Sequence, residues 1–384
     1  MSKLLRVLVF IFFVLSAIYY SWLNSSNYIS ESEYNKALSV IPPIQALNFG
    51  ADRKMGNIIG VQAFVAPLEY STEKRFFEKT ENYLLEAKKK GWLNSKSLIV
   101  FPEHYGSFLF LVDEPASVFQ SEDYKEAINK IISKKSPEYY KSYPFSKSQN
   151  PSTETVLRIK SSQMKKIYQD TFSTLSRIYQ VNIIAGSIAL PSTFIKNGDL
   201  ELSDNGALEN SGFLFLPDGK IHESKFSKKN LNSLEKMILA PGDSGKQKVK
   251  LSSWSEEFGI LYSLDSLYLK NYTNDLLDND IDIIVSPSSL IDGESIDWSL
   301  PEIYMNASEQ KKPPEIINQD FFQNWTKYSI LEKMKVTQAR IGFQVFLQGK
   351  IFSTKFVGAS NFTVRYVRTE MIETNKNLIF NLWL

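Results

Sequence analysis

The feature that most constrains the fold is a short apolar run at residues 98–101, which ends directly before Pro102 and Glu103. A run that is apolar on both faces is typical of a strand buried inside an α/β sheet. A strand expected at 58–65 and a helix expected at 71–91 precede it, and this β-α-β order predicts parallel neighbours in one sheet. We therefore predict an α/β fold.

Glu103 follows this strand directly and has two interpretations. A carboxylate just past the end of a buried strand lies at the edge where open α/β folds build their sites. The alternative is a loop glutamate that is simply solvated. This stretch alone leaves both interpretations open.

The rest of the chain continues to alternate between strands and helices. A long amphipathic helix is expected at 155–180, and buried strands are expected at 181–190 and 258–262. The turn Pro217-Asp218-Gly219 predicts a β-hairpin over 212–226, and a second hairpin is expected over 343–352. Two segments, an insertion at about 105–152 and a loop at 292–314, carry no recognisable motif and are expected to shape a substrate pocket.

The N-terminus carries a nearly unbroken apolar run at residues 7–23. It is slightly shorter than the roughly 20 residues that cross a bilayer core of about 30 Å, although Leu4 and Leu5 extend it past Arg6. We expect a single-pass signal anchor at 1–23; the competing interpretation is a cleaved signal peptide, for which the sequence after the run is a poor cleavage site. Lys3 and Arg6 precede the run, which places the bulk of the chain outside the cytoplasm. A juxtamembrane connector is expected at 24–56 and one folded domain at 57–384.

Composition excludes several kinds of chemistry. Lys and Arg number 44 against 42 Asp and Glu, a net charge of +2, so no nucleic-acid partner is expected. With 0 Cys, the chain can form no disulfide, zinc-thiolate site or thiol nucleophile. The two histidines, His104 and His222, are too few for a metal centre, and no metal is expected. We expect His104 to point away from the site, because it is adjacent to Glu103 on a strand end.

Several short motifs share an order along residues 58–360. They are Val61-Gln62-Ala63, Pro102-Glu103, Gly186-Ser187, Pro217-Asp218-Gly219, Lys228-Lys229-Asn230-Leu231, Glu235, Pro241-Gly242 and Gly259-Ile260-Leu261-Tyr262-Ser263-Leu264-Asp265. In this order they resemble the nitrilase, or carbon–nitrogen hydrolase, superfamily. Each motif alone is weakly specific, whereas the shared order is specific.

The resemblance implies an α-β-β-α sandwich with its site at the strand ends. It implies Glu103 as general base, Lys228 as the group that stabilises the oxyanion, Glu235 as a second glutamate and Ser263 at the nucleophile position. The implied substrate is a small molecule or acyl compound with an amide, nitrile or N-acyl group, and no cofactor is expected. Homo-oligomers are usual in that family, although the sequence names no interface.

Position 263 departs from the family pattern, whose nucleophile is a Cys. A thiol is partly ionised near neutral pH, whereas a serine hydroxyl is far harder to deprotonate. Two hypotheses follow: Ser263 is a slow or specially activated nucleophile of a membrane-anchored hydrolase or acyltransferase, or the domain is a pseudoenzyme that binds a ligand or partner. An introduced replacement of Cys by Ser is a third reading that one sequence leaves open.

Overall fold

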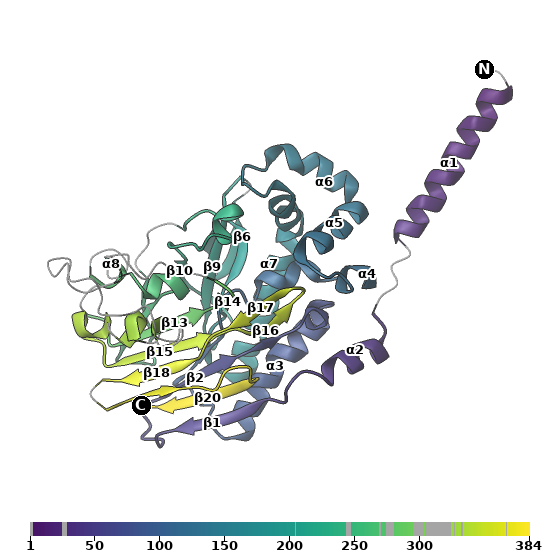
Figure 1. The fold of residues 1–384 in the computed structure, drawn as a ribbon. Helices are drawn as coiled ribbons and strands as arrows, with labels where there is room; N and C mark the ends of the chain where they lie inside the picture. The colour runs from purple at the N-terminus through teal and green to yellow at the C-terminus, as the bar shows by residue number, and fades with distance from the viewer. Residues whose placement is uncertain are drawn as a thin grey trace.

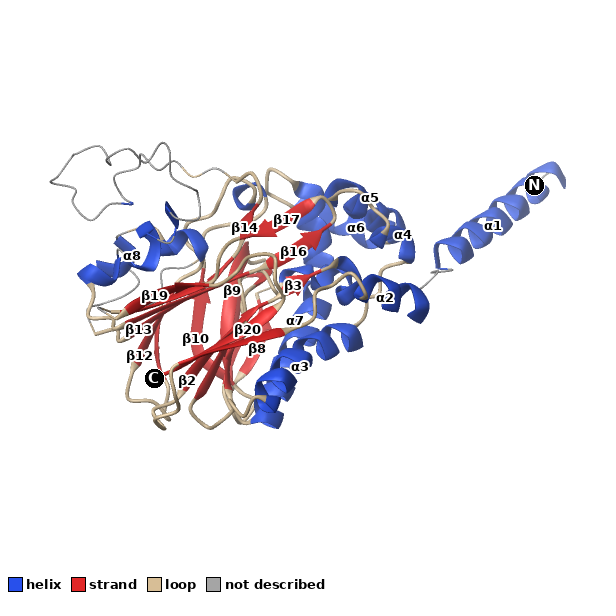
Figure 2. Ribbon diagram, turned by 60° about the horizontal axis from the view of Figure 1, so that its bottom comes forward, coloured by secondary structure: helices blue, strands red, loops and turns tan. Residues whose placement is uncertain are grey.

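The computed structural model describes residues 3–24, 29–203, 205–242, 247–268, 270–273, 280–294, 296, 303, 324–325, 327–331, 333–365 and 367–384. The fold is mixed α/β, and its centre is a pair of β-sheets packed face to face (Figure 1). Figure 2 shows the strands in red between helices, with α3 (Glu73–Lys89) and α7 (Pro151–Tyr179) on one outer side.

The first sheet contains the apolar run that precedes Glu103 as a central strand. Its order is β1 (Gln45–Phe49), β20 (Leu378–Trp383), β2 (Asn57–Gln62), β4 (Ser97–Val100), β5 (Asn182–Ile184), β9 (Leu208–Phe215) and β10 (Ile221–Ser227), with β6 (Ile188–Pro191) also paired to β9. Strands β2, β4 and β5 are parallel, as the β-α-β order predicts, and β9 and β10 form the predicted antiparallel hairpin.

The second sheet carries the strand that leads to Ser263. Its order is β11 (Lys248–Lys250), β12 (Glu257–Ile260), β13 (Ile283–Ser288), β15 (Ile341–Phe346), β18 (Asn361–Val364) and β19 (Arg368–Met371). Smaller pairings join β14 (Leu290–Ile291), β17 (Thr354–Val357), β16 (Gln348–Ile351) and β3 (Phe64–Val65), and separately β7 (Thr193–Lys196) and β8 (Asp199–Leu202).

Apolar side chains from both sheets form the core between them, with Ile58 and Val100 from one sheet and Ile260 and Phe343 from the other. Helices α3 and α7 cover the outer face of the first sheet through side chains such as Phe172. A thinner layer covers the second sheet and includes α8 (Lys270–Thr273), η8 (Lys327–Leu331) and η9 (Met334–Val336). The described elements therefore form a mixed α/β fold with two packed sheets, covered by long helices on one outer face and by short helical turns on the other.

Local sequence signals explain where the two long helices begin and end. The Thr72 hydroxyl caps α3 by accepting the Arg75 N–H, and Asn150 caps α7 in the same way. Gly91, just beyond the end of α3, has a φ of 72°, a left-handed conformation that costs glycine little.

The predicted insertion is a set of short helices. They are α4 (Ala116–Phe119), α5 (Tyr124–Lys134) and α6 (Ser136–Ser142), with the 3₁₀ turns η2 (Ser107–Leu111) and η3 (Tyr143–Phe145). Most of the loop expected at 292–314 lies outside the described residues.

Two predicted boundaries differ from the structure. The connector expected at 24–56 contains the helix α2 (Glu31–Leu38), and β1, which pairs in parallel with the C-terminal strand β20 and so belongs to the sheet. The hairpin expected over 343–352 is wrong: β15 pairs with β13 and β18, whereas β16 pairs with β17 and β3. The chain therefore changes sheets near Leu347. The two apolar runs on either side of this residue, which the sequence pattern predicts to pair with each other, belong to different sheets.

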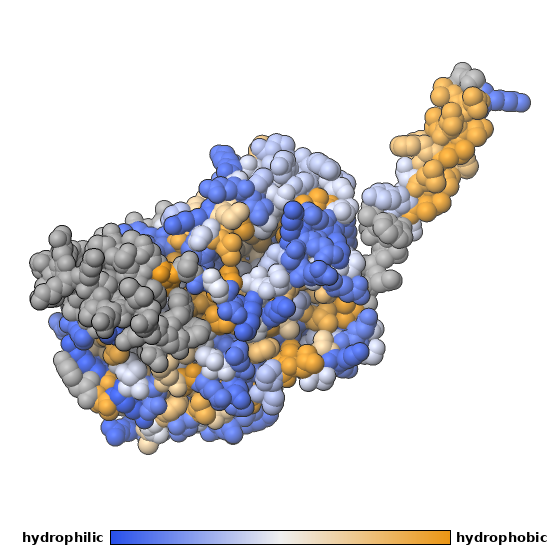
Figure 3. All heavy atoms as spheres, in the orientation of Figure 1, coloured by the Kyte–Doolittle hydropathy of each residue, from blue (hydrophilic) through white to orange (hydrophobic). Residues whose placement is uncertain are grey.

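The N-terminal helix α1 (Lys3–Asn24) is present, and most of its described apolar side chains are exposed. Figure 3 shows them as an apolar surface along the helix. Over the residues that the structure describes, no helix has both the length and the apolar character needed to cross a membrane. The transmembrane helix expected at 1–23 is thus not supported.

Candidate active site

The four residues predicted for the site come together although they are far apart in sequence. Glu103 follows β4, Lys228 follows β10, and Ser263 follows β12 at the start of η5 (Ser263–Ser266). Glu235 opens the short turn η4 (Glu235–Met237). All four side chains are buried. The solvated-loop interpretation of Glu103 is therefore wrong, because this residue is 0% exposed.

Lys228 lies at the centre of the group. Its Nζ lies 3.0 Å from Glu103 Oε1 and 2.8 Å from each carboxylate oxygen of Glu235. Burial alone would lower the pKa of Lys228, but the two carboxylates outweigh burial and raise it above its ordinary value. Lys228 is therefore a fixed ammonium ion with two anionic partners.

Ser263 sits in a strained backbone conformation next to this ion network. Its φ is 37°, in the left-handed region that non-glycine residues rarely adopt. The Ser263 hydroxyl donates to Glu103 Oε2, and the Ser289 N–H donates to Ser263 Oγ over 2.7 Å. The Ser289 carbonyl is a second acceptor, 3.0 Å from Ser263 Oγ. The hydroxyl is thus held between a carboxylate and a backbone donor.

Asp265 fixes the segment that presents Lys228. Its carboxylate accepts the N–H groups of Lys229 over 3.0 Å and Asn230 over 2.7 Å, and it also accepts the Asn230 side-chain amide. Burial raises the pKa of Asp265 to about 6, although these hydrogen bonds oppose the rise. The geometry of this segment follows from a buried carboxyl group that serves as a backbone acceptor.

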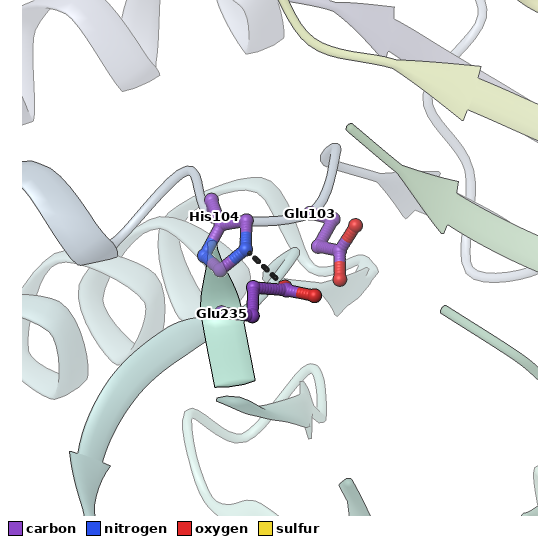
Figure 4. A group of neighbouring side chains, drawn as sticks. All are labelled: Glu103, His104 and Glu235. Carbon is purple, nitrogen blue, oxygen red and sulfur yellow. Dashed lines mark hydrogen bonds and ion pairs between the residues drawn. The ribbon is translucent and has the colours of Figure 1, made fainter. Parts of the chain in front are cut away.

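His104 lies in the site, and the expectation that it points away was wrong. The argument from strand alternation assumed extended backbone, but His104 has a φ of 62° and its N–H donates to Ser187 Oγ over 2.8 Å. This turn sends the ring toward Glu235, with Nε2 2.8 Å from Glu235 Oε1 (Figure 4). His222 lies on β10, where its Nδ1 accepts the Ser224 N–H.

Two other residues of the site were not predicted from the sequence. Asn210 on β9 donates from Nδ2 to Glu103 Oε1 over 2.8 Å, and Ser289 contacts Ser263 through its backbone. A polar side chain within the wholly buried strand β9 was the available signal for Asn210. Nothing in the sequence marks Ser289, because its contribution comes from the main chain.

Three side chains in the site have the donor types of a metal site. Ligand atoms of Glu103, His104 and Glu235 lie within 4.8 Å of one another. The Lys228 ammonium group already binds both carboxylates, at distances of 2.8 to 3.0 Å. The carboxylates are therefore neutralised by an amine, and the arrangement fits a buried ammonium ion better than a divalent cation.

No protein-family model matches the chain, and no curated protein matches it in sequence. Solved structures of the nitrilase superfamily are similar to it in fold. A mutant of the Nesterenkonia AN1 amidase has a TM-score of 0.46 at 10% identity, covering 86% of this chain and 92% of that one. A carbon-nitrogen hydrolase from Helicobacter pylori G27 has a TM-score of 0.46 at 17% identity, covering 84% and 86%. Saccharomyces cerevisiae Nit3 has a TM-score of 0.45 at 13% identity, covering 85% and 89%. These similarities concern the fold alone.

Proposed function

We propose that this protein is a carbon–nitrogen hydrolase in which Ser263 is the nucleophile, acting on an amide, nitrile or N-acyl group. The observation that supports this function is the bonded arrangement of a hydroxyl, a carboxylate and an ammonium ion. Glu103 accepts from the Ser263 hydroxyl and also binds the Lys228 ammonium group, and all three side chains are buried. A nucleophile beside a base and a fixed positive charge is what acyl transfer requires.

For an amide, the proposed reaction has two balanced halves. Ser263 Oγ attacks the carbonyl carbon while its proton passes to Glu103, and Lys228 stabilises the negative charge that develops on the carbonyl oxygen. The C–N bond then breaks, and the amine leaves with the proton from Glu103, so that an ester on Ser263 remains. Water attacks this ester and gives its proton to Glu103, which returns it to Ser263 Oγ as the carboxylic acid is released. Glu235 holds Lys228 throughout.

A second candidate function is ligand binding without turnover. The observation that favours it is the oxygen at position 263: no histidine reaches Ser263 among the hydrogen bonds of the described residues, so the hydroxyl depends on a carboxylate base. In this pseudoenzyme, the ion network would shape a polar pocket for a ligand or partner.

Substitutions at position 263 separate the two functions. If the hydrolase proposal holds, the wild type turns over members of an amide, nitrile and acyl-ester panel, and Ser263→Ala abolishes turnover. Ser263→Cys should in addition react with iodoacetamide faster than a free cysteine, because the Lys228 ammonium group favours the thiolate and Glu103 can accept the thiol proton. The change is nearly isosteric and should alter the free energy of unfolding by less than about 1.5 kcal/mol.

The two results that contradict the hydrolase proposal are distinct. Catalysis by the wild type is refuted if it turns over no compound of the panel above the background rate that the Glu103→Gln and Lys228→Met variants also show. If the Ser263→Cys variant folds correctly but its thiol reacts no faster than free cysteine, the claim that the surrounding site can activate a nucleophile is refuted. Ligand binding that persists in both proteins without any reaction supports the pseudoenzyme.

We also propose that α1 attaches the protein to a membrane and that the folded domain lies outside the cytoplasm. Exposed apolar side chains on this helix, including Phe10, Phe12 and Phe13, support an apolar environment around it, and Lys3 and Arg6 at its start support the orientation. A C-terminal reporter that is active only outside the cytoplasm would agree with this topology. Activity of the reporter only in the cytoplasm, or a soluble form cleaved near Ser25, would refute it.

A further inference from the structure

We propose that His104 is a positioning residue for Lys228, acting through Glu235 as a neutral ring whose proton is on Nε2. The inference rests on the proposed function, in which the Lys228 ammonium group stabilises charge on the substrate. In the described part of the chain, His104 makes no hydrogen bond or ion pair with Ser263 or Lys228, and its ring reaches the site through Glu235 Oε1, 2.8 Å from Nε2.

The partners of Ser107 assign the proton on the ring. The Ala189 N–H can only donate, and it donates to Ser107 Oγ over 3.0 Å. Ser107 Oγ can accept a second hydrogen bond, but its hydroxyl has one proton, and among the described residues the acceptor for that proton is His104 Nδ1, 3.1 Å away. Nδ1 therefore accepts, and the proton of the neutral ring is on Nε2, where the Glu235 carboxylate, which can only accept, lies 2.8 Å away.

One amide and three charged groups also face the ring. Asn210 Nδ2 lies 3.4 Å from His104 Nε2, but it makes its shorter bond, 2.8 Å, to Glu103 Oε1. The charged groups beside the ring are the carboxylates of Glu103 and Glu235, with Lys228 between them. A ring that donates from Nε2 adds a bond to this network without adding a charge.

Glu235 is hydrogen-bonded to both His104 and Lys228 and so links the ring to the ammonium group. Its Oε1 accepts from His104 Nε2 and Lys228 Nζ, and its Oε2 accepts from Lys228 Nζ and from the Asn232 N–H over 2.9 Å. Burial alone would raise the pKa of Glu235, yet Lys228 and then His104 lower it to about 2. Without the ring, one side of the carboxylate loses its donor, and Glu235 can rotate away from the position in which both oxygens hold the ammonium group.

The first test measures the tautomer directly and needs no substrate. The chain has only two histidines, so nitrogen-15 NMR of the ring nitrogens can be assigned by comparing the full-length wild type with His104→Gln. We expect His104 to show the Nε2–H tautomer in the wild type. Ser107→Ala removes the donor to Nδ1 but leaves the Glu235 acceptor, so the ring should keep its proton on Nε2. A wild-type ring protonated on Nδ1 alone would overturn the assignment.

The second test measures positioning through the reactivity of a thiol in the Ser263→Cys background. His104→Leu and His104→Gln are a matched pair, since neither side chain is branched at Cβ and both stand at the same strained φ, but only Gln can donate to Glu235. We expect His104→Leu to lower the rate constant for iodoacetamide by about 10- to 100-fold, as a misplaced charged group does. His104→Gln should stay within about threefold of the parent.

The outcomes separate this inference from the function on which it rests. If the Ser263→Cys parent reacts like a free cysteine, the proposed function fails, while the NMR experiment still tests the tautomer of His104. If the parent is activated and His104→Leu leaves its rate unchanged, the positioning role is refuted. If His104→Leu does not fold, as judged by circular dichroism, His104→Ala in the same background replaces it, and an unchanged rate refutes the positioning role.

Discussion

Replacing Lys228 by methionine tests the central ion pair. The side chain is 1% exposed, and its Nζ is the cation between two carboxylates that are also buried. Methionine occupies a similar volume without a charge, so Lys228→Met leaves two anions facing each other. Removing one partner of a buried ion pair costs about 3–5 kcal/mol. Because three groups share this network, we expect a loss of at least about 3 kcal/mol in the free energy of unfolding at pH 7.

The loss should depend on pH in a defined direction. In folded Lys228→Met, one carboxyl of the pair must hold a proton that the unfolded chain releases near pH 4.3. A group whose pKa is raised by folding stabilises the protein below its unfolded pKa, and this stability is lost as the pH rises toward the folded pKa. The difference from the wild type should therefore widen from pH 5 to pH 7, by at most about 1.4 kcal/mol per pH unit.

Urea unfolding at pH 5, 6 and 7 measures both quantities. The matched control is Lys228→Met combined with Glu235→Gln, which removes one of the two charges; it should be more stable than the single variant at pH 7 and nearly free of the added pH dependence. A loss below about 1 kcal/mol that is the same at every pH would show that Lys228 does not neutralise the two carboxylates.

Two further variants test the support of the site. Folding raises the pKa of Asp265 from 3.8 to about 6, so ionising it should cost the wild type about 3 kcal/mol between pH 4 and pH 7. In Asp265→Asn that pH dependence should be absent, and parallel urea-unfolding curves for the two proteins would contradict the raised pKa. In Gly212→Ala the new Cβ would lie 1.8 Å from the Tyr262 hydroxyl oxygen and 2.2 Å from the Gly186 carbonyl, so we expect a loss of about 1–3 kcal/mol or more; an unchanged urea midpoint would contradict this packing.

The sequence predicted the chemical groups of the site better than their directions. Glu103, Lys228, Glu235 and Ser263 could be named because each follows a recognisable strand or turn, and their order resembles one family. The direction of His104 could not, because side chains alternate only in extended backbone, and a φ of 62° interrupts that alternation directly after Glu103. Ser289 contributes only main-chain groups, which a sequence motif does not mark.

The limits of the fold prediction have a similar cause. Strand β1 pairs with β20, and the register joins Gln45 to Leu378, near the opposite end of the chain. Local periodicity identifies a short strand only when its burial pattern is regular, and β1 alternates too weakly between exposed and partly buried residues for this. The mistaken hairpin near Leu347 has the same origin, because adjacency in sequence was taken for pairing in space.

The environment of Ser263 addresses the main objection to a serine at this position, which is the cost of removing its proton. The hydroxyl has one proton and two acceptors, the Glu103 carboxylate and the Ser289 carbonyl. The carboxylate is the stronger acceptor because its bond is charge-assisted, so the proton is directed to the base. The Ser289 N–H, 2.7 Å from Oγ, then favours the form in which negative charge develops on the oxygen. A carboxylate base and a backbone donor therefore act on the same oxygen, where hydrolases with a serine usually use a histidine. The proposed hydrolase uses this geometry, and turnover by the wild type, lost in Ser263→Ala, is the result on which that proposal depends.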